Sequence, residues 1–188
     1  GGNVHPPKKV SVLEGLRACD SILVNEELAS VYENWCKQKE NIADPGKEWG
    51  KWPYFYPEMP LSEEMVKAAS AETDTAVVFI GRAAGEEREN FLGEGSYYLT
   101  EEEKRMLSLV TENFENTVLV LNCGNIIDMS FTLEYNFNAI LMMWLPGMEA
   151  GNALADVLSG KENPSGKLAT TIAKTYEDYP SASNFGGE

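Results

Sequence analysis

The chain has 188 residues, which is enough for one well-buried domain and too few for two of ordinary size. Its 43% hydrophobic and 24% charged residues are typical of globular proteins and exclude a disordered chain, and no apolar run approaches the roughly 20 residues of a membrane helix. Thirty acidic against 15 basic side chains give a net charge of −15, which would repel a phosphate backbone and argues against a nucleic-acid partner.

The first part of the chain predicts two helices followed by a long loop. Residues 9–20 carry apolar side chains at helical spacing, and a second amphipathic helix follows Asn25, a plausible N-cap. Residues 41–60 contain four prolines and two glycines, which predicts a loop. This loop is rich in aromatic side chains: Trp49, Trp52, Tyr54, Phe55 and Tyr56.

The remainder predicts apolar strands that alternate with helices. Ser62 opens a short helix, and Thr100 with Glu103 forms the capping box of a longer one. Residues 128–136 form a short segment that is either helical or irregular. A helix is expected over 149–158, and Gly160 suits the C′ position at its end. Strands are expected over 75–80, 117–121, 138–144 and 167–172. This alternation predicts one α/β domain over 1–188, a three-layer α/β/α sandwich of flavodoxin-like type with a mostly parallel sheet.

In such a sheet the ligand crevice lies at the carboxyl ends of the strands. The stretch from Gly81 to Asn90 follows the strand 75–80 and combines glycines with Glu86, Glu87 and Glu89. It has neither the Walker spacing nor GxGxxG, and its acidity disfavours a phosphate site. The pattern leaves two interpretations open, a solvated charged loop and a site of carboxylate acid/base chemistry.

Other candidates compete with this loop. Glu94, between two glycines, is not distinguished from Glu86 by composition. The aromatic side chains of 49–56, among them Trp49 and Trp52, offer flat faces that stack on sugar rings, or they close an edge of the sandwich or contact another domain. The three cysteines are in no CxxC spacing, and with one histidine, His5, the chain lacks the ingredients of a structural zinc site or a Ser-His-Asp triad.

Several segments, in order, resemble the second domain of glycoside hydrolase family 3, the β-glucosidase and β-xylosidase family. They are VSVLEGL (10–16), DTAVVFIGRAAGEE (74–87), YLTEEEKRML (98–107), VLVLNCGNIIDMS (118–130), ILMMWLPGMEAGNALADVLSGKENPSGKLATTIA (140–173) and YPSASNFGGE (179–188). The long block 140–173 is the most specific. Together the segments cover most of the chain.

The resemblance implies that this domain supplies the acid/base glutamate of an active site whose aspartate nucleophile lies on a (β/α)₈ barrel. The register of the family loop places that glutamate on Glu86, since Glu94 falls too late in it. The family usually has glycine next and an aspartate-arginine pair shortly after, whereas this chain has Glu87 and Glu89-Asn90. Arg82, in the family's GR position, is expected to orient the loop, to touch substrate or to form a structural salt bridge.

By this resemblance the intact protein is a retaining β-glucosidase-type hydrolase that needs no metal or organic cofactor. Its expected partners are a barrel domain of the same protein, in an order resembling the bacterial members whose barrel comes second, and a β-linked glucoside or short oligosaccharide. A barrel needs about 250 residues, so this chain alone is expected to be inactive. The alternative from another class is a non-catalytic carbohydrate-binding or scaffold domain, and an N-acetylhexosaminidase is disfavoured because it would leave Glu86 without a role.

Overall fold

The computed structural model describes residues 7–38, 53–84 and 89–184, and contacts divide the chain into two compact units. One unit comprises residues 35–144 with 168–188, and the other residues 1–34 with 145–167. In the described residues no helix is long and apolar enough to cross a membrane.

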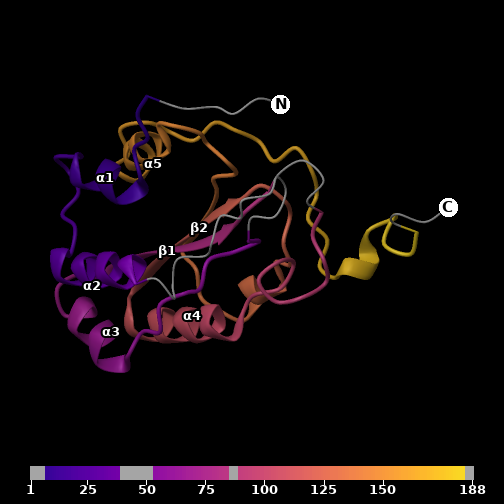
Figure 1. Cartoon of the computed structure of the whole chain (residues 1–188), viewed down its shortest axis with the longest axis horizontal. Helices are drawn as coiled ribbons and strands as arrows, with labels where there is room; N and C mark the ends of the chain where they lie inside the picture. Colours follow the sequence, from indigo (N-terminus) through magenta and orange to yellow (C-terminus); the bar gives the residue numbers. More distant parts are fainter. Residues whose placement is uncertain (1–6, 39–52, 85–88, 185–188) are drawn as a thin grey trace. The chain divides into compact units, whose positions relative to one another are not determined.

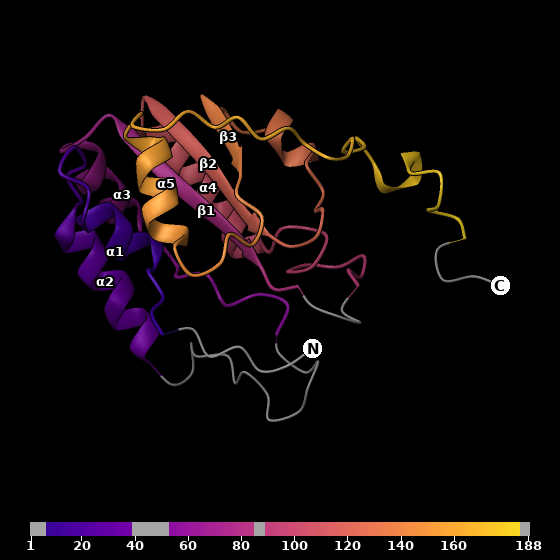
Figure 2. The ribbon, with the colours of Figure 1, turned by 90° about the horizontal axis from the view of Figure 1, so that it is seen from above.

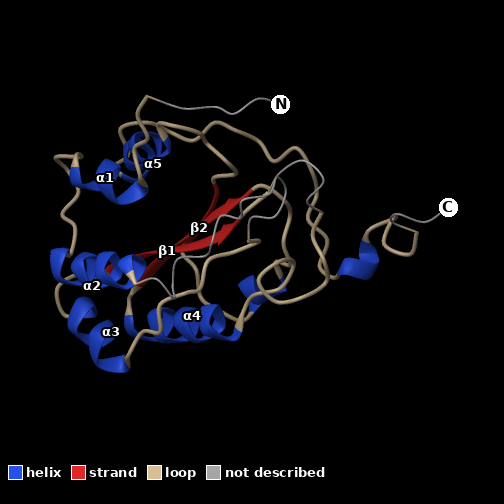
Figure 3. Cartoon of the chain, viewed as in Figure 1, coloured by secondary structure: helices blue, strands red, loops and turns tan. Residues whose placement is uncertain are grey.

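The first of these units is built on a parallel sheet, shown by the red strands in Figure 3. Its strands are β1 (Thr75–Arg82), β2 (Asn116–Cys123) and β3 (Ala139–Met142), in the order β1-β2-β3. Arg82 pairs with Cys123, and Met142 pairs with Leu121. The carboxyl ends of all three strands therefore meet at one edge, as the predicted α/β class requires.

Helices α4 (Glu101–Asn113) and α3 (Glu63–Ser70), which are labelled in Figure 1, belong to the same unit. Helix α4 contacts β1 and β2, and α3 contacts α4. Leu107 of α4 and Leu119, Val120 and Leu121 of β2 are fully buried and form the centre of the core. The predicted starts are confirmed, since Ser62 caps α3 and Thr100 with Glu103 forms a capping box on α4.

The later part of this unit departs from the expected strands. β3, which lies beside β2 in Figure 2, has four residues rather than the seven predicted over 138–144. The strand predicted over 167–172 is wrong, because these residues have no regular secondary structure. Leu168 is exposed there, and an apolar run becomes a strand only where a neighbour supplies ladder hydrogen bonds. The segment 128–136, predicted to be helical or irregular, contains the 3₁₀ turn Ser130–Leu133.

The other unit contains α1 (Val12–Arg17), α5 (Ala150–Leu158) and most of α2 (Glu26–Lys37). Helices α1 and α5 lie side by side in both ribbon views (Figures 1 and 2). They approach so closely that a Cβ added to Gly15 would lie 2.1 Å from the carbonyl carbon of Gly151. The Asn25 side chain caps α2 by accepting from Leu28 N–H at 2.9 Å, and Gly160 follows α5 with φ 75°, as predicted.

Candidate functional site

The loop between β1 and α4 begins at the carboxyl edge of the sheet, where the sequence places the candidate site. Glu86 lies within residues 85–88, and Trp49 and Trp52 lie within residues 39–52, all outside the described residues. The catalytic role of Glu86 and the sugar-stacking role of the two tryptophans therefore stay predictions. The described residues on both sides of Glu86 show how the loop is attached.

Arg82, the last residue of β1, is buried at the base of this loop. Its Nε donates to the carbonyl of Ser96 at 3.1 Å, and its Nη1 donates to the carbonyl of Gly81 at 2.8 Å. Its Nη2 donates to the carbonyl of Tyr98 at 3.3 Å, and the two terminal nitrogens donate to Glu103 Oε1 and Oε2 at 2.6 and 2.8 Å. All five guanidinium N–H groups thus have protein acceptors. This geometry supports the salt-bridge interpretation of Arg82 over a direct contact with substrate.

Glu103 joins Arg82 to the start of α4. Its Oε2 accepts from Arg82 and also from the backbone N–H of Thr100, both at 2.8 Å. The Thr100 hydroxyl accepts in return from Glu103 N–H at 3.2 Å. One buried carboxylate therefore completes a capping box and a bidentate ion pair, the stronger form of an arginine-carboxylate contact.

The far side of the loop is tied to the segment after β2. The Asn90 amide donates to the carbonyl of Ile126 at 2.5 Å, and its oxygen accepts from Asn125 at 3.2 Å. The hydroxyl of Ser96, which is buried, accepts from Phe91 N–H at 3.1 Å. Asn90, one of the departures from the family pattern, thus has a structural role, and sequence reasoning did not assign one to Ser96 or Asn90.

Two aromatic side chains of the predicted cluster pack against the same loop. Tyr54 meets Phe91 edge to face at 5.0 Å between ring centroids, and its carbonyl accepts from Ala83 N–H at 2.6 Å. The Phe55 ring lies 5.9 Å from the guanidinium carbon of Arg82. Gly95, with φ 74°, passes so close to Phe55 that an added Cβ would lie 2.1 Å from the ring. These contacts agree with aromatic residues that close an edge of the sandwich.

Glu94, the competing candidate, lies in a tight turn rather than in an enclosed site. Its side chain is exposed, and the turn is closed by Gly95 N–H donating to the carbonyl of Tyr98 at 2.9 Å. The pKa of Lys104 is raised, chiefly by its hydrogen bond to Glu101, and the charge of Glu94 adds to that shift. The described geometry gives Glu94 no buried partner of the kind that Arg82 and Glu103 have.

The ends of β2 and β3 complete the edge of the sheet. Cys123 is fully buried, and burial raises the pKa of its thiol to about 11, so it is protonated and unreactive. Trp144 has φ 55°, unusual for a residue with a side chain, and its carbonyl accepts from the Asn122 amide. In the described residues no group of three or more His, Cys, Asp or Glu side chains is placed to hold a metal ion.

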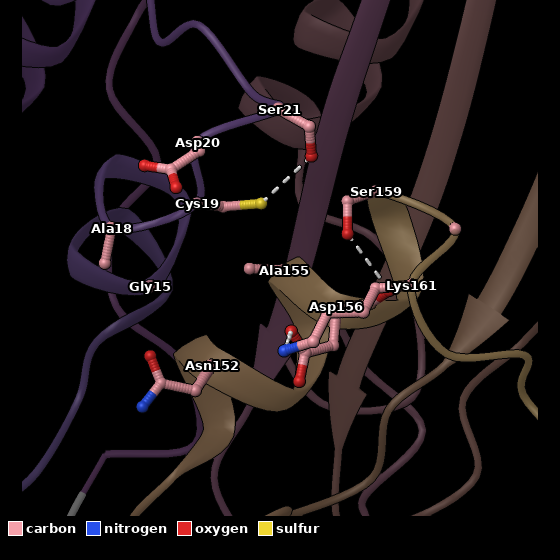
Figure 4. Close-up of a pocket in the computed structure, with 11 residues that line it drawn as sticks. Gly15, Ala18, Cys19, Asp20, Ser21, Asn152, Ala155, Asp156, Ser159 and Lys161 are labelled. Carbon is pink, nitrogen blue, oxygen red and sulfur yellow. Dashed lines mark hydrogen bonds and ion pairs between the residues drawn. The ribbon is translucent and has the colours of Figure 1, made fainter.

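A hollow of about 720 Å³ lies in the unit of α1 and α5 (Figure 4). Several of the side chains that line it interact with one another. Cys19 Sγ lies 3.4 Å from Ser21 Oγ, and Lys161 forms an ion pair with Asp156 at 2.8 Å. The hydrogen bond with Ser21 lowers the pKa of Cys19. Arg82, the predicted site residue that the structure describes, is not among the residues that line this hollow.

Residues 1–187 match the family model described as the glycosyl hydrolase family 3 C-terminal domain. The chain belongs to glycosyl hydrolase family 3. It is 42% identical to a β-glucosidase of Ruminococcus albus over 98% of the chain and 19% of that protein. This family 3 domain also superposes on a β-glucosidase structure from Paenibacillus barengoltzii with a TM-score of 0.93 and 44% identity, over the whole chain and 20% of that structure.

A second structural relative is β-glucosidase 3B from Thermotoga neapolitana, solved in complex with glucose. The TM-score is 0.81 at 32% identity, over 96% of this chain and 25% of that one. The predicted family and α/β fold are confirmed. The chain spans only about a fifth to a quarter of the length of these relatives.

Proposed function

We propose that this family 3 domain is part of a retaining β-glucosidase and supplies its general acid/base, Glu86. The reaction is the hydrolysis of terminal non-reducing β-glucosyl residues, and the aspartate nucleophile lies on a (β/α)₈ barrel elsewhere in the same protein. The match of almost the entire chain to the family domain, with a relative named β-glucosidase at 42% identity, carries this proposal. The attachment of the loop at the carboxyl edge of the sheet supports it.

The chemistry needs two carboxyl groups about 5–5.5 Å apart, one that attacks the anomeric carbon and one that protonates the leaving oxygen. The second group then acts as base for the water that releases the sugar. In this proposal Glu86 is protonated when the glycosidic bond breaks, so that it can donate the proton to the leaving oxygen.

The isolated chain is then half of an active site. We expect it to hydrolyse no glucoside and to bind glucose or cellobiose only weakly, whereas a carbohydrate-binding domain would bind them by itself. Calorimetric titration of the chain with both sugars, beside the full-length protein, separates the two functions. Tight binding by the chain alone, together with normal turnover in full-length Glu86→Gln, would favour the non-catalytic alternative.

The role of Glu86 is tested in the full-length protein by Glu86→Gln, which keeps the size of the side chain and removes its acid. General acid catalysis contributes about 10²–10⁴-fold, so kcat/KM for cellobiose should fall by that factor. Glu94→Gln is the matched control and should retain nearly all activity. If Glu94→Gln loses the activity and Glu86→Gln keeps it, the assignment belongs to Glu94.

A further inference from the structure

We infer that Arg82 and Glu103 are positioning residues for acid catalysis, because they fix both ends of the loop that joins β1 to α4. This inference rests on the proposed function, since the loop carries Glu86. Neither residue is proposed to touch substrate. They act through the backbone of the loop.

The hydrogen bonds of Arg82 run to both ends of the loop. Gly81 lies before the loop, whereas Ser96 and Tyr98 lie ten and twelve residues after Glu86 in the sequence, and the carbonyls of all three accept from the one guanidinium. Glu103 holds the plane of that guanidinium in one orientation, since each carboxylate oxygen accepts from one terminal nitrogen. The planar group thereby sets the distance and angle between the end of β1 and the return of the loop.

Folding alone does not require this pair. Replacing a buried ion pair by neutral side chains of similar volume is often neutral or stabilising, and the side chains of Arg82 and Glu103 are only 2% and 6% exposed. An apolar pair would fill the same space, but it would leave the carbonyls of Gly81, Ser96 and Tyr98 without the donors that Arg82 provides. At this edge of the sheet the ion pair therefore contributes the orientation of the loop backbone rather than stability.

The consequence for catalysis concerns the distance over which the proton moves. A general acid must lie within hydrogen-bond reach of the leaving oxygen, and a displacement of about 1 Å costs about 10²-fold in rate. Such a displacement matters for a poor leaving group, which must be protonated as it departs. It matters little for dinitrophenolate, which departs as an anion.

The experiment compares cellobiose and 2,4-dinitrophenyl β-glucoside as substrates of the full-length protein. The variant Arg82→Met/Glu103→Gln removes both charges together, and the glutamine that it introduces retains an oxygen that can accept from Thr100 N–H. Arg105→Met is the control at an exposed arginine that pairs with Glu102 at 2.8 Å. We expect the double variant to lose about 10²-fold in kcat/KM for cellobiose and less than about 3-fold for the dinitrophenyl substrate, both measured at a temperature at which circular dichroism shows the variant folded.

Equal losses on both substrates, or no loss on either, would overturn the positioning role and leave a structural one. Arg82→Lys gives the second test if the double variant does not fold, because lysine keeps a charge beside Glu103 but has only three donors. Arg82→Lys should also lose more kcat/KM for cellobiose than for the dinitrophenyl substrate. If the ratio of the two kcat/KM values equals that of the wild type, the inference is overturned as well. Glu86→Gln shows which proposal has failed, because without a substrate difference in that variant the proposed function itself is wrong.

Discussion

Arg82→Met should strongly destabilise the 188-residue chain, because it leaves the Glu103 carboxylate buried without its partner. The ion pair joins side chains that are 2% and 6% exposed, at 2.6 Å between Arg82 Nη1 and Glu103 Oε1. Removing one partner of a buried pair costs about 3–5 kcal/mol. At a urea slope of about 2 kcal/mol per M, a loss of about 4 kcal/mol lowers the unfolding midpoint by about 2 M. Urea unfolding curves recorded by circular dichroism measure this shift of the midpoint.

The same substitution at the surface supplies the control. Arg105→Met breaks the pair with Glu102, whose side chains are 50% and 34% exposed, and should cost less than about 0.5 kcal/mol. The double variant Arg82→Met/Glu103→Gln should recover at least about 2 kcal/mol of the loss, since no unpaired charge remains. An Arg82→Met loss below about 1 kcal/mol at unchanged slope, or no recovery in the double variant, would refute the reasoning.

Two further predictions concern packing in the separate units. Gly151→Ala would place a Cβ 1.9 Å from the carbonyl oxygen of Ser11, so we expect a loss of about 2–3 kcal/mol despite the better helix propensity of alanine. Gly166→Ala is the control and should be neutral, because its added Cβ meets nothing within 4 Å. Equal urea unfolding midpoints for the two variants would contradict the close crossing of α1 and α5. Cys36 is exposed and Cys123 is buried with its pKa raised to about 11, so a thiol reagent should label Cys36 in the native chain and Cys123 only after unfolding.

Local signals predicted the elements well where hydrogen bonds form between near neighbours. Ser62 at the start of α3 and the Thr100–Glu103 capping box on α4 are confirmed, because each needs only residues three positions apart. The strands 75–80 and 117–121 are confirmed with small extensions, since buried parallel strands are continuous apolar runs. The strand expected over 167–172 is wrong, because within the described part of the chain these residues pair with no strand.

The candidate site was less accessible to sequence reasoning. The sequence predicts a salt bridge as one of three roles for Arg82, but it indicates Glu103, the partner 21 residues later, only as part of a helix cap. A contact at that separation depends on how β1 and α4 pack, which no local pattern specifies. Asn90 departs from the family pattern, and its contacts with Asn125 and Ile126 depend on the path that the chain takes after β2.

Azide rescue of full-length Glu86→Ala tests the central claim most directly. With 2,4-dinitrophenyl β-glucoside the glucosyl intermediate should form without an acid and accumulate, because no base activates water to release it. Azide needs no base, so it should restore turnover and yield β-glucosyl azide. Rescue with that product is the predicted result. Wild-type turnover of cellobiose by Glu86→Ala, or azide rescue of Glu94→Ala instead, would contradict the account.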